Sequence, residues 1–200
     1  MKKILLSLDL DETLIHSLSC NENKKEIEYD FLLSNEVPVI KRPMLNYFMS
    51  FIDKNKNIEY GFFSKAGSQY VKEIVSEICS KINKKPLFVL DYNSMTTVHN
   101  DSMYCSGYNE PGKIKDLKKI KKYSEDGFKR MIAIDDLMNY PRQRGNVIMV
   151  KPFEGNKEDK ELLKIKKIIS FLIEKDNVRD YIKNYTVDNN IMNKKDFNIK

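Results

Sequence analysis

The chain lacks a long apolar segment. None of its 200 residues lies in an apolar run that approaches the roughly 20 residues needed to cross a bilayer. The apolar start at residues 4–6 is soon followed by Asp9, Asp11 and Glu12, with no small-residue cleavage site after them. A secretory signal has a longer uninterrupted apolar region. We therefore expect a buried first strand rather than a signal peptide, and no membrane partner.

Cysteine is scarce. Cys20, Cys79 and Cys105 are odd in number, widely spaced and without a metal-type pair. A disulfide framework or a cysteine metal site requires closely patterned cysteines. The sequence therefore predicts a reducing environment, with the protein inside the cell in the cytoplasm or the nucleus.

The chain also lacks a stretch rich in arginine and aromatic residues. Its net charge is +6, but lysines supply most of the positive charge and are interspersed with glutamates. A nucleic-acid groove usually shows clustered basic residues on one face. The pattern instead favours a solvated surface, and we expect no direct nucleic-acid binding.

What the sequence does contain is an alternation of strand-like and helix-like segments. The hydrophobic fraction of 41% is ordinary for a globular protein. Short apolar runs that predict strands lie at residues 3–8, 58–63, 87–92, 131–134 and 147–150. Helical spacing of apolar residues appears at 43–52, 69–82 and 162–172, and shorter helices or turns are expected at 114–123 and 178–184. The alternation predicts an α/β, three-layer, Rossmann-like fold around a mostly parallel sheet.

Two interruptions of this pattern predict local additions. Residues 17–42 contain a polar stretch and two β-prone pieces, 27–33 and 37–40, which predict a small β-hairpin flap. Residues 87–112 form a variable insert rich in Asn, Ser, Tyr and Gly. Neither is long enough for a large cap domain. We expect a single domain over residues 1–184 and a loosely held tail over 185–200.

Acidic residues follow two of the predicted strands. Asp9 and Asp11 come after the first strand, and Asp135 and Asp136 end a later one. Ligands of parallel sheets bind at the carboxyl ends of the strands, where both pairs are expected. Single acids at such junctions often cap helices. Capping does not explain two acids at each of two strand ends, so the pattern favours a functional site.

These residue types suit phosphoryl transfer. Neighbouring carboxylates repel each other, and a divalent cation relieves the repulsion. Asp9, Asp136 and a backbone carbonyl near Asp11 offer the oxygen ligands that Mg²⁺ prefers. A carboxylate can attack phosphorus, and a second acid can move protons. Ser64 and a lysine before the fourth strand are candidates to hold the phosphoryl oxygens.

The motifs also resemble a known family. The run from Leu8 to Ser17 resembles the signature of the haloacid-dehalogenase-like phosphatases that act on the C-terminal domain of RNA polymerase II, a branch that includes the nuclear-interactor-type enzymes. Further motifs follow in the family's order, so the resemblance extends from residue 4 to about residue 173. They are Lys41-Arg42-Pro43, Phe62-Phe63-Ser64-Lys65-Ala66, Lys115-Asp116-Leu117, Ile134-Asp135-Asp136, Lys151-Pro152-Phe153-Glu154-Gly155 and Asp159-Lys160-Glu161-Leu162-Leu163.

The resemblance implies a role for each matching residue. Asp9 is expected to be the nucleophile, and Asp11 the general acid and base with its carbonyl on Mg²⁺. Thr13 and Ser64 are expected near the substrate phosphate, Thr13 mainly to orient the loop and Ser64 in place of the usual threonine. Lys115 is expected to bind phosphate and steady Asp9. Asp136, with Asp135 beside it, is expected to complete the metal site.

Some positions depart from the family or leave alternatives open. Leu137 replaces a small polar residue, and residues 87–112 match poorly. Lys113 stands two residues before Lys115, so either lysine is a candidate for the phosphate. We expect His16 to pack or orient the loop and Arg42 to have a structural role.

The sequence leaves three functions open. The leading one is a Mg²⁺-dependent phosphatase that forms an aspartyl-phosphate and acts on phosphoserine or phosphothreonine in proteins or peptides, because an open crevice suits a phosphorylated loop or tail. The second is a phosphatase for nucleotides, nucleic-acid ends or small molecules. The third is a non-catalytic binding module of the same fold.

Overall fold

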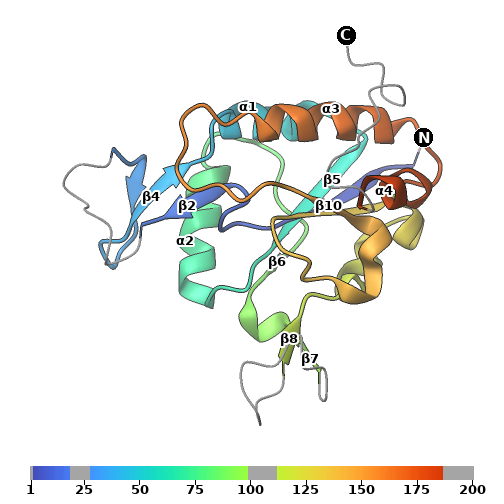
Figure 1. The fold of residues 1–200 in the computed structure, drawn as a ribbon, viewed down its shortest axis with the longest axis horizontal. Coiled ribbons are helices and arrows are strands. Elements are labelled where there is room, and N and C mark those ends of the chain that lie inside the picture. The colour runs from blue at the N-terminus through green and yellow to red at the C-terminus, as the bar shows by residue number, and fades with distance from the viewer. Residues whose placement is uncertain (1, 19–27, 99–111, 187–200) are drawn as a thin grey trace.

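A parallel sheet forms the centre of the molecule (Figure 1). The computed structural model describes residues 2–18, 28–98 and 112–186, with side chains up to residue 182. The sheet order is β10-β9-β1-β5-β6, and each neighbouring pair is parallel. The strands are β1 (Ile4–Leu8), β5 (Ile58–Phe63), β6 (Val89–Leu90), β9 (Met131–Asp135) and β10 (Val147–Met149). The predicted α/β fold around a mostly parallel sheet is confirmed.

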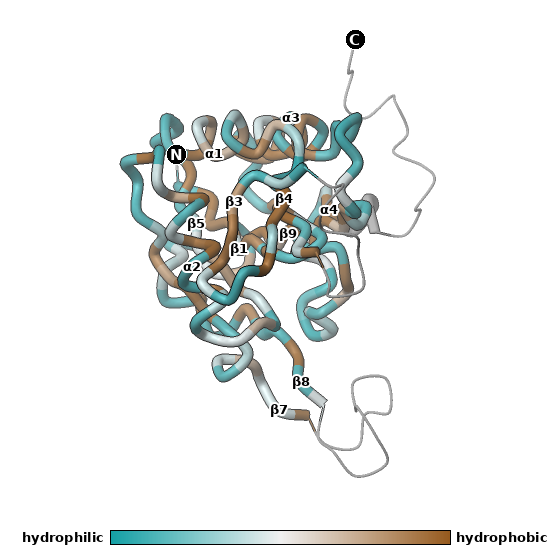
Figure 2. The backbone as a smooth tube through the Cα atoms, turned by 90° about the vertical axis from the view of Figure 1, so that its left-hand side faces the viewer, coloured by the Kyte–Doolittle hydropathy of each residue, from teal (hydrophilic) through white to brown (hydrophobic). Residues whose placement is uncertain are grey.

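Both faces of the sheet are buried, which explains why its strands are apolar throughout. In β1, Ile4, Leu6 and Leu8 enter one core cluster, whereas Leu5 enters a second cluster on the opposite face. Successive side chains of a strand point to opposite faces, so every position of β1 is removed from water. Figure 2 shows the apolar stretches of the strands in the middle of the molecule.

The two faces are covered differently. On the first face, most of the helical residues of the core cluster come from α1 (Leu45–Lys54), α2 (Ser68–Cys79) and α3 (Glu161–Ile173). The second face is covered mainly by 3₁₀ helices, η2 (Leu117–Tyr123), η3 (Gly127–Arg130) and η4 (Pro141–Asn146). The last helix, α4 (Arg179–Thr186), contacts β10 and η4. The short helix or turn expected at 114–123 is therefore a 3₁₀ helix that begins at Leu117.

The flap has one strand more than the predicted hairpin. It is an antiparallel sheet in the order β2-β4-β3, formed by β2 (Ile15–Ser17), β4 (Pro38–Lys41) and β3 (Phe31–Leu32). Strand β2 begins four residues after Asp11, so the flap is tied directly to the acidic loop. Part of the predicted polar stretch, residues 19–27, lies outside the described residues.

The insert also forms an antiparallel pair. After β6 the chain forms the 3₁₀ helix η1 (Tyr92–Ser94), and then β7 (Thr96–Val98) pairs with β8 (Gly112–Ile114). Residues 99–111 lie outside the described part of the chain. Strand β8 ends one residue before Lys115, so this arm starts beside the carboxyl ends of the strands. Among the described residues, the flap and this arm are the only additions to the sheet and its helices.

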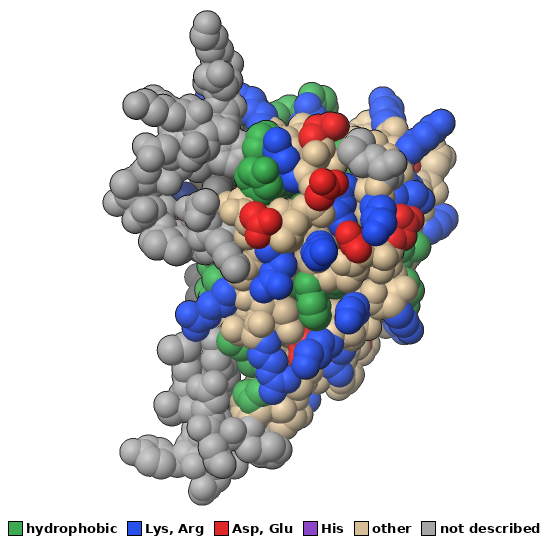
Figure 3. Space-filling view, turned by 90° about the vertical axis from the view of Figure 1, so that its right-hand side faces the viewer, with side chains coloured by type: hydrophobic (Ala, Val, Ile, Leu, Met, Phe, Trp, Pro, Cys, Tyr) green, Lys and Arg blue, Asp and Glu red, His purple; other side chains and the backbone are tan. Residues whose placement is uncertain are grey.

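Two surface properties bear on possible partners. Among the helices of the described residues, none has both the length and the apolar character needed to span a membrane. On the face drawn in Figure 3, lysine and arginine side chains are interspersed with acidic ones.

Candidate active site

The two acidic pairs meet at one edge of the sheet. Strands β1 and β9 are parallel neighbours with Leu8 opposite Ile134, so the residues that follow them lie side by side. The backbone amide of Asp9 donates to the carbonyl of Ile134 at 3.0 Å. One carboxylate oxygen from each of Asp9, Asp135 and Asp136 lies within 4.8 Å of the other two. We call these three residues and Asp11 the acidic cluster.

Lys115 is the lysine that reaches the acidic cluster. Its buried ammonium donates to Asp9 Oδ1 and to Asp135 Oδ2, each at 2.6 Å. The backbone amide of Lys115 donates to the Asn139 carbonyl at 2.9 Å, which ties the end of β8 to the loop after β9. Lys113 instead places its ammonium 5.0 Å from the centre of the Tyr92 ring. Of the two lysines that the sequence left open, the structure brings Lys115 to the acids.

The two acids of the β9 end have different surroundings. Asp135 accepts from the Leu137 amide at 2.9 Å and from the Asn139 amide group at 3.0 Å through Oδ1, while Lys115 occupies Oδ2. Asp136 instead bonds to the Thr13 hydroxyl, through its Oδ1 and its backbone amide. Both oxygens of Asp135 are thus engaged, which suits a residue that orients Lys115.

Thr13 is fully buried and holds Asp136. Its hydroxyl donates to Asp136 Oδ1 at 3.2 Å and accepts from the Asp136 amide at 3.1 Å. These two bonds join the loop after β1 to the loop after β9. The hydroxyl is therefore directed at Asp136, in keeping with the loop-orienting role expected for Thr13.

Asp11 lies between two hydroxyl groups. Ser64, which follows β5, has its Oγ 3.5 Å from Asp11 Oδ2 and accepts from the Ala66 amide at 3.0 Å. Tyr70, in the first turn of α2, donates to Asp11 Oδ1. The sequence analysis placed Tyr70 inside a helix and gave it no role. Its position in the first turn of the helix that follows Ser64 could have indicated that Tyr70 lies near the site.

Arg42 and His16 lie outside the acidic cluster. The buried guanidinium of Arg42 donates to the carbonyls of Thr13 at 2.9 Å and Lys151 at 2.7 Å. It also forms a double contact with Asp159, at 2.9 and 2.8 Å. His16 Nδ1 lies 2.9 Å from a Glu12 carboxylate oxygen, and its ring meets Phe153 edge-on. These contacts agree with the structural and loop-orienting roles expected for the two residues.

Burial makes the acidic cluster electrostatically unusual. Loss of water raises the pKa of Asp9 to about 6, although Lys115 opposes the shift. Burial and the neighbouring Asp9 raise the pKa of Asp135 to about 6 as well. Burial would lower the pKa of Lys115, but Asp9 and Asp135 raise it above its ordinary value, so the ammonium stays charged. Four carboxylates beside this one ammonium leave negative charge in excess.

The donor set fits a magnesium ion. The three clustered residues offer only carboxylate oxygens, the ligand type that Mg²⁺ prefers. The excess negative charge is the condition that a divalent cation relieves. Asp9 and Asp136 are placed to offer carboxylate oxygens to one ion.

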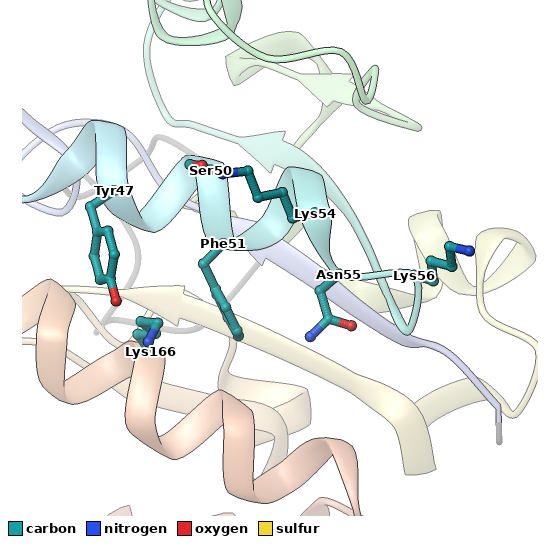
Figure 4. Close-up of a pocket in the computed structure, with 7 residues that line it drawn as sticks. All are labelled: Tyr47, Ser50, Phe51, Lys54, Asn55, Lys56 and Lys166. Atoms are coloured by element: carbon teal, nitrogen blue, oxygen red, sulfur yellow. The ribbon is translucent and has the colours of Figure 1, made fainter.

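A separate pocket lies away from the acidic cluster (Figure 4). Tyr47, Phe51 and Lys54 of α1, with Asn55, Lys56 and Lys166, are among its lining residues. Asn55 and Lys56 precede the start of β5, whereas the acids follow the ends of β1 and β9. The pocket therefore belongs to the opposite end of the sheet.

Comparisons with known proteins agree with the motifs. The family model described as NLI interacting factor-like phosphatase matches residues 4–179. A comparison with curated proteins found no match.

Two solved structures resemble this chain in fold. One is Fcp1, described as an essential RNA polymerase II CTD phosphatase, with 16% identity and a TM-score of 0.49 over 94% of this chain. The other is a variant of fission yeast Fcp1 bound to beryllium fluoride, also with 16% identity and a TM-score of 0.49, over 91% of this chain. This chain spans only 55% and 54% of those two proteins. The family match, by contrast, covers most of the chain and confirms the resemblance drawn from the motifs. The chain belongs to the family of NLI interacting factor-like phosphatases.

Proposed function

We propose that this protein is a Mg²⁺-dependent phosphatase that forms an aspartyl-phosphate on Asp9 and acts on phosphoserine or phosphothreonine in proteins. The observation that carries the proposal is the position of Asp9. It is buried, bonded to Lys115 at 2.6 Å and clustered with Asp135 and Asp136 within 4.8 Å, with Asp11 two residues further on. The family match supports the reaction class.

The residues divide the reaction into two steps. In the first, an Asp9 oxygen attacks phosphorus, the ester P–O bond breaks, and Asp11 gives a proton to the leaving oxygen. In the second, Asp11 removes a proton from a water that attacks the same phosphorus. The P–O bond to Asp9 then breaks, which releases phosphate and regenerates the carboxylate. Lys115 and the Ser64 hydroxyl stabilise the phosphoryl oxygens as their charge changes.

The metal is assigned to Asp9, Asp136 and the main-chain carbonyl of Asp11. Bound Mg²⁺ supplies positive charge that offsets the carboxylates and the phosphoryl oxygens. Asp135, which the sequence analysis placed among the ligands, has both oxygens in hydrogen bonds. We therefore assign it to holding Lys115.

The absence of a lid domain among the described residues supports a protein substrate. The described residues add only the three-stranded flap and the β7–β8 arm to the central sheet and its helices. The two internal stretches outside them, residues 19–27 and 99–111, are too short to form an independent lid domain. A small metabolite needs enclosure to exclude water, whereas a phosphorylated loop or tail does not. The scarce, unpatterned cysteines favour action inside the cell.

The test compares phosphate release from different substrates with and without Mg²⁺. We expect metal-dependent hydrolysis of phenyl phosphate, and a kcat/KM at least ~10-fold higher for phosphoserine and phosphothreonine peptides than for nucleoside monophosphates, because the peptide extends beyond the phosphate. Asp9→Asn should lower turnover at least ~1,000-fold, because the nucleophile is lost. Tyr60→Phe is the control, since the Tyr60 hydroxyl bonds to the Lys84 carbonyl and not to the acids.

A different result would contradict each part of the proposal. Full activity in Asp9→Asn would exclude Asp9 as the nucleophile. Turnover of nucleotides or small phosphates alone would exclude the protein-phosphatase assignment. An inactive parent protein would favour a binding module of the same fold.

A further inference from the structure

Asp11 is held by a hydroxyl that the reaction scheme does not use. Tyr70 donates to Asp11 Oδ1 from the first turn of α2, whereas Ser64 Oγ lies 3.5 Å from the other oxygen, Asp11 Oδ2. The other three carboxylates of the acidic cluster interact with Lys115 or Thr13. Asp11 is therefore oriented by different partners from the residues around it.

Counting protons fixes the direction of the hydrogen bonds. An oxygen of Asp11 that carries no proton only accepts, whether the group is ionised or protonated on its other oxygen, and a tyrosine hydroxyl has a single proton to donate. Because the Tyr70 hydroxyl donates its hydrogen bond to Asp11 Oδ1, the Ser17 hydroxyl, which also contacts the Tyr70 hydroxyl, must donate to the Tyr70 oxygen. The bonds therefore run from Ser17 to Tyr70 to Asp11. They join β2 of the flap, helix α2 and the loop after β1.

The position of Asp11 matters more than that of an ordinary surface acid. A general acid must lie within hydrogen-bond reach of the leaving oxygen, and a displacement of about 1 Å can cost roughly 100-fold in rate. Asp11 is on a loop, so its backbone alone does not set its χ angles. Tyr70, anchored on a helix and bonded to Ser17, removes that freedom.

We propose that Tyr70 is a positioning residue that holds Asp11 in the orientation from which it transfers protons, with Ser17 fixing the Tyr70 hydroxyl. The inference rests on the proposed function, because it requires Asp11 to act as the general acid. Tyr70 acts through Asp11 and does not itself exchange a proton with the substrate.

The test uses two aryl phosphates that differ in their need for an acid. Dinitrophenolate is a weakly basic leaving group that departs without a proton, whereas phenolate departs more readily when protonated. For both substrates, kcat/KM reports the first phosphoryl transfer. Tyr70→Phe should lower kcat/KM for phenyl phosphate at least ~10-fold, and for dinitrophenyl phosphate less than ~3-fold, because only the first needs a well-placed acid.

A double-mutant comparison separates positioning from general damage. In an Asp11→Asn background, Tyr70→Phe should change kcat/KM for phenyl phosphate less than ~2-fold, because the partner through which it acts is already lost. Tyr60→Phe removes another tyrosine hydroxyl, bonded to the Lys84 carbonyl at 2.7 Å, and should affect both substrates equally and slightly.

The possible outcomes are distinct. Equal losses for the two substrates in Tyr70→Phe, or no loss for either, would overturn the positioning role while leaving the proposed function intact. The same holds for independent effects of Tyr70→Phe and Asp11→Asn. A parent protein that hydrolyses neither aryl phosphate would overturn the proposed function and this inference together.

Discussion

Two buried ionic contacts in this protein differ in their balance of charge. In the acidic cluster, Lys115 bonds to Asp9 and Asp135 while Asp11 and Asp136 lie close by. In the second contact, the buried Arg42 faces one acid, Asp159, and two backbone carbonyls.

The contact between Arg42 and Asp159 is neutral, and its guanidinium is hydrogen-bonded. The acidic cluster around Lys115, by contrast, has more negative than positive charge. Buried charge alone therefore does not mark a reactive site. Buried charge left in excess does, because a cation or a phosphoryl group can relieve it.

The largest stability effect is expected at the neutral contact. Arg42→Met removes one partner of a buried pair and leaves Asp159 uncompensated, which should cost about 3–5 kcal/mol of unfolding free energy. Chemical denaturation measures the loss, and Mg²⁺ should not restore it. Lys157→Met is the control, because Lys157 pairs with Glu28 and both side chains are exposed, so the change should cost less than about 1 kcal/mol. Equal losses in the two variants would show that the buried Arg42–Asp159 pair contributes no more to stability than an exposed pair.

A matched change at the acidic cluster should act mainly on activity. Lys115→Met removes the cation that steadies Asp9 and binds phosphate, so turnover of phenyl phosphate should fall at least ~100-fold. Its cost in stability should be smaller than that of Arg42→Met. Asp9 and Asp135, with pKa values of about 6, can take up protons when the ammonium is lost. A variant that stays active but unfolds readily would show that Lys115 is structural.

Metal binding provides a third contrast. Mg²⁺ at about 100 times its Kd should stabilise the parent protein by about 2.7 kcal/mol, which a rise in Tm reports. Asp136→Asn should lose most of that rise. Without metal it should be more stable than the parent by about 1 kcal/mol, because one repelling charge is gone. A Tm rise of parental size in Asp136→Asn would exclude Asp136 as a ligand.

The smallest effect concerns pH. Burial tends to raise the pKa of Asp159, but hydrogen bonds from Arg42 and the Glu161 amide outweigh it, so the pKa lies below its ordinary value. A lowered folded-state pKa gives stability that is present above the unfolded pKa and lost as pH falls through the folded one. The parent protein should therefore exceed Asp159→Asn in stability by a constant amount above about pH 5, and the difference should shrink below about pH 4. Denaturation at a series of pH values measures it. A difference that grows on acidification would contradict the sign.

Much of the site was predictable because it depends on strand ends. Apolar runs identify the parallel strands, and parallel strands bring their carboxyl ends to one edge. Acids at the ends of two such strands therefore meet when the strands are neighbours, as Asp9 and Asp135 do at the ends of β1 and β9. The chemistry of these acids follows from their type, and the surrounding motifs were sufficient to identify the family.

The tertiary structure alone decided which side chains hold those acids. The Lys115-Asp116-Leu117 motif favoured Lys115, but the nearby Lys113 stayed a candidate until the structure was known. Nothing in the local sequence selects Tyr70 from the other residues of its helix. Arg42 and Asp159 are 117 positions apart, and the sequence has no periodic signal that links them. Strand periodicity fixes which backbone ends meet, because every strand obeys the same geometry. Side-chain partners depend on how particular segments pack, and that packing is set by the whole core at once.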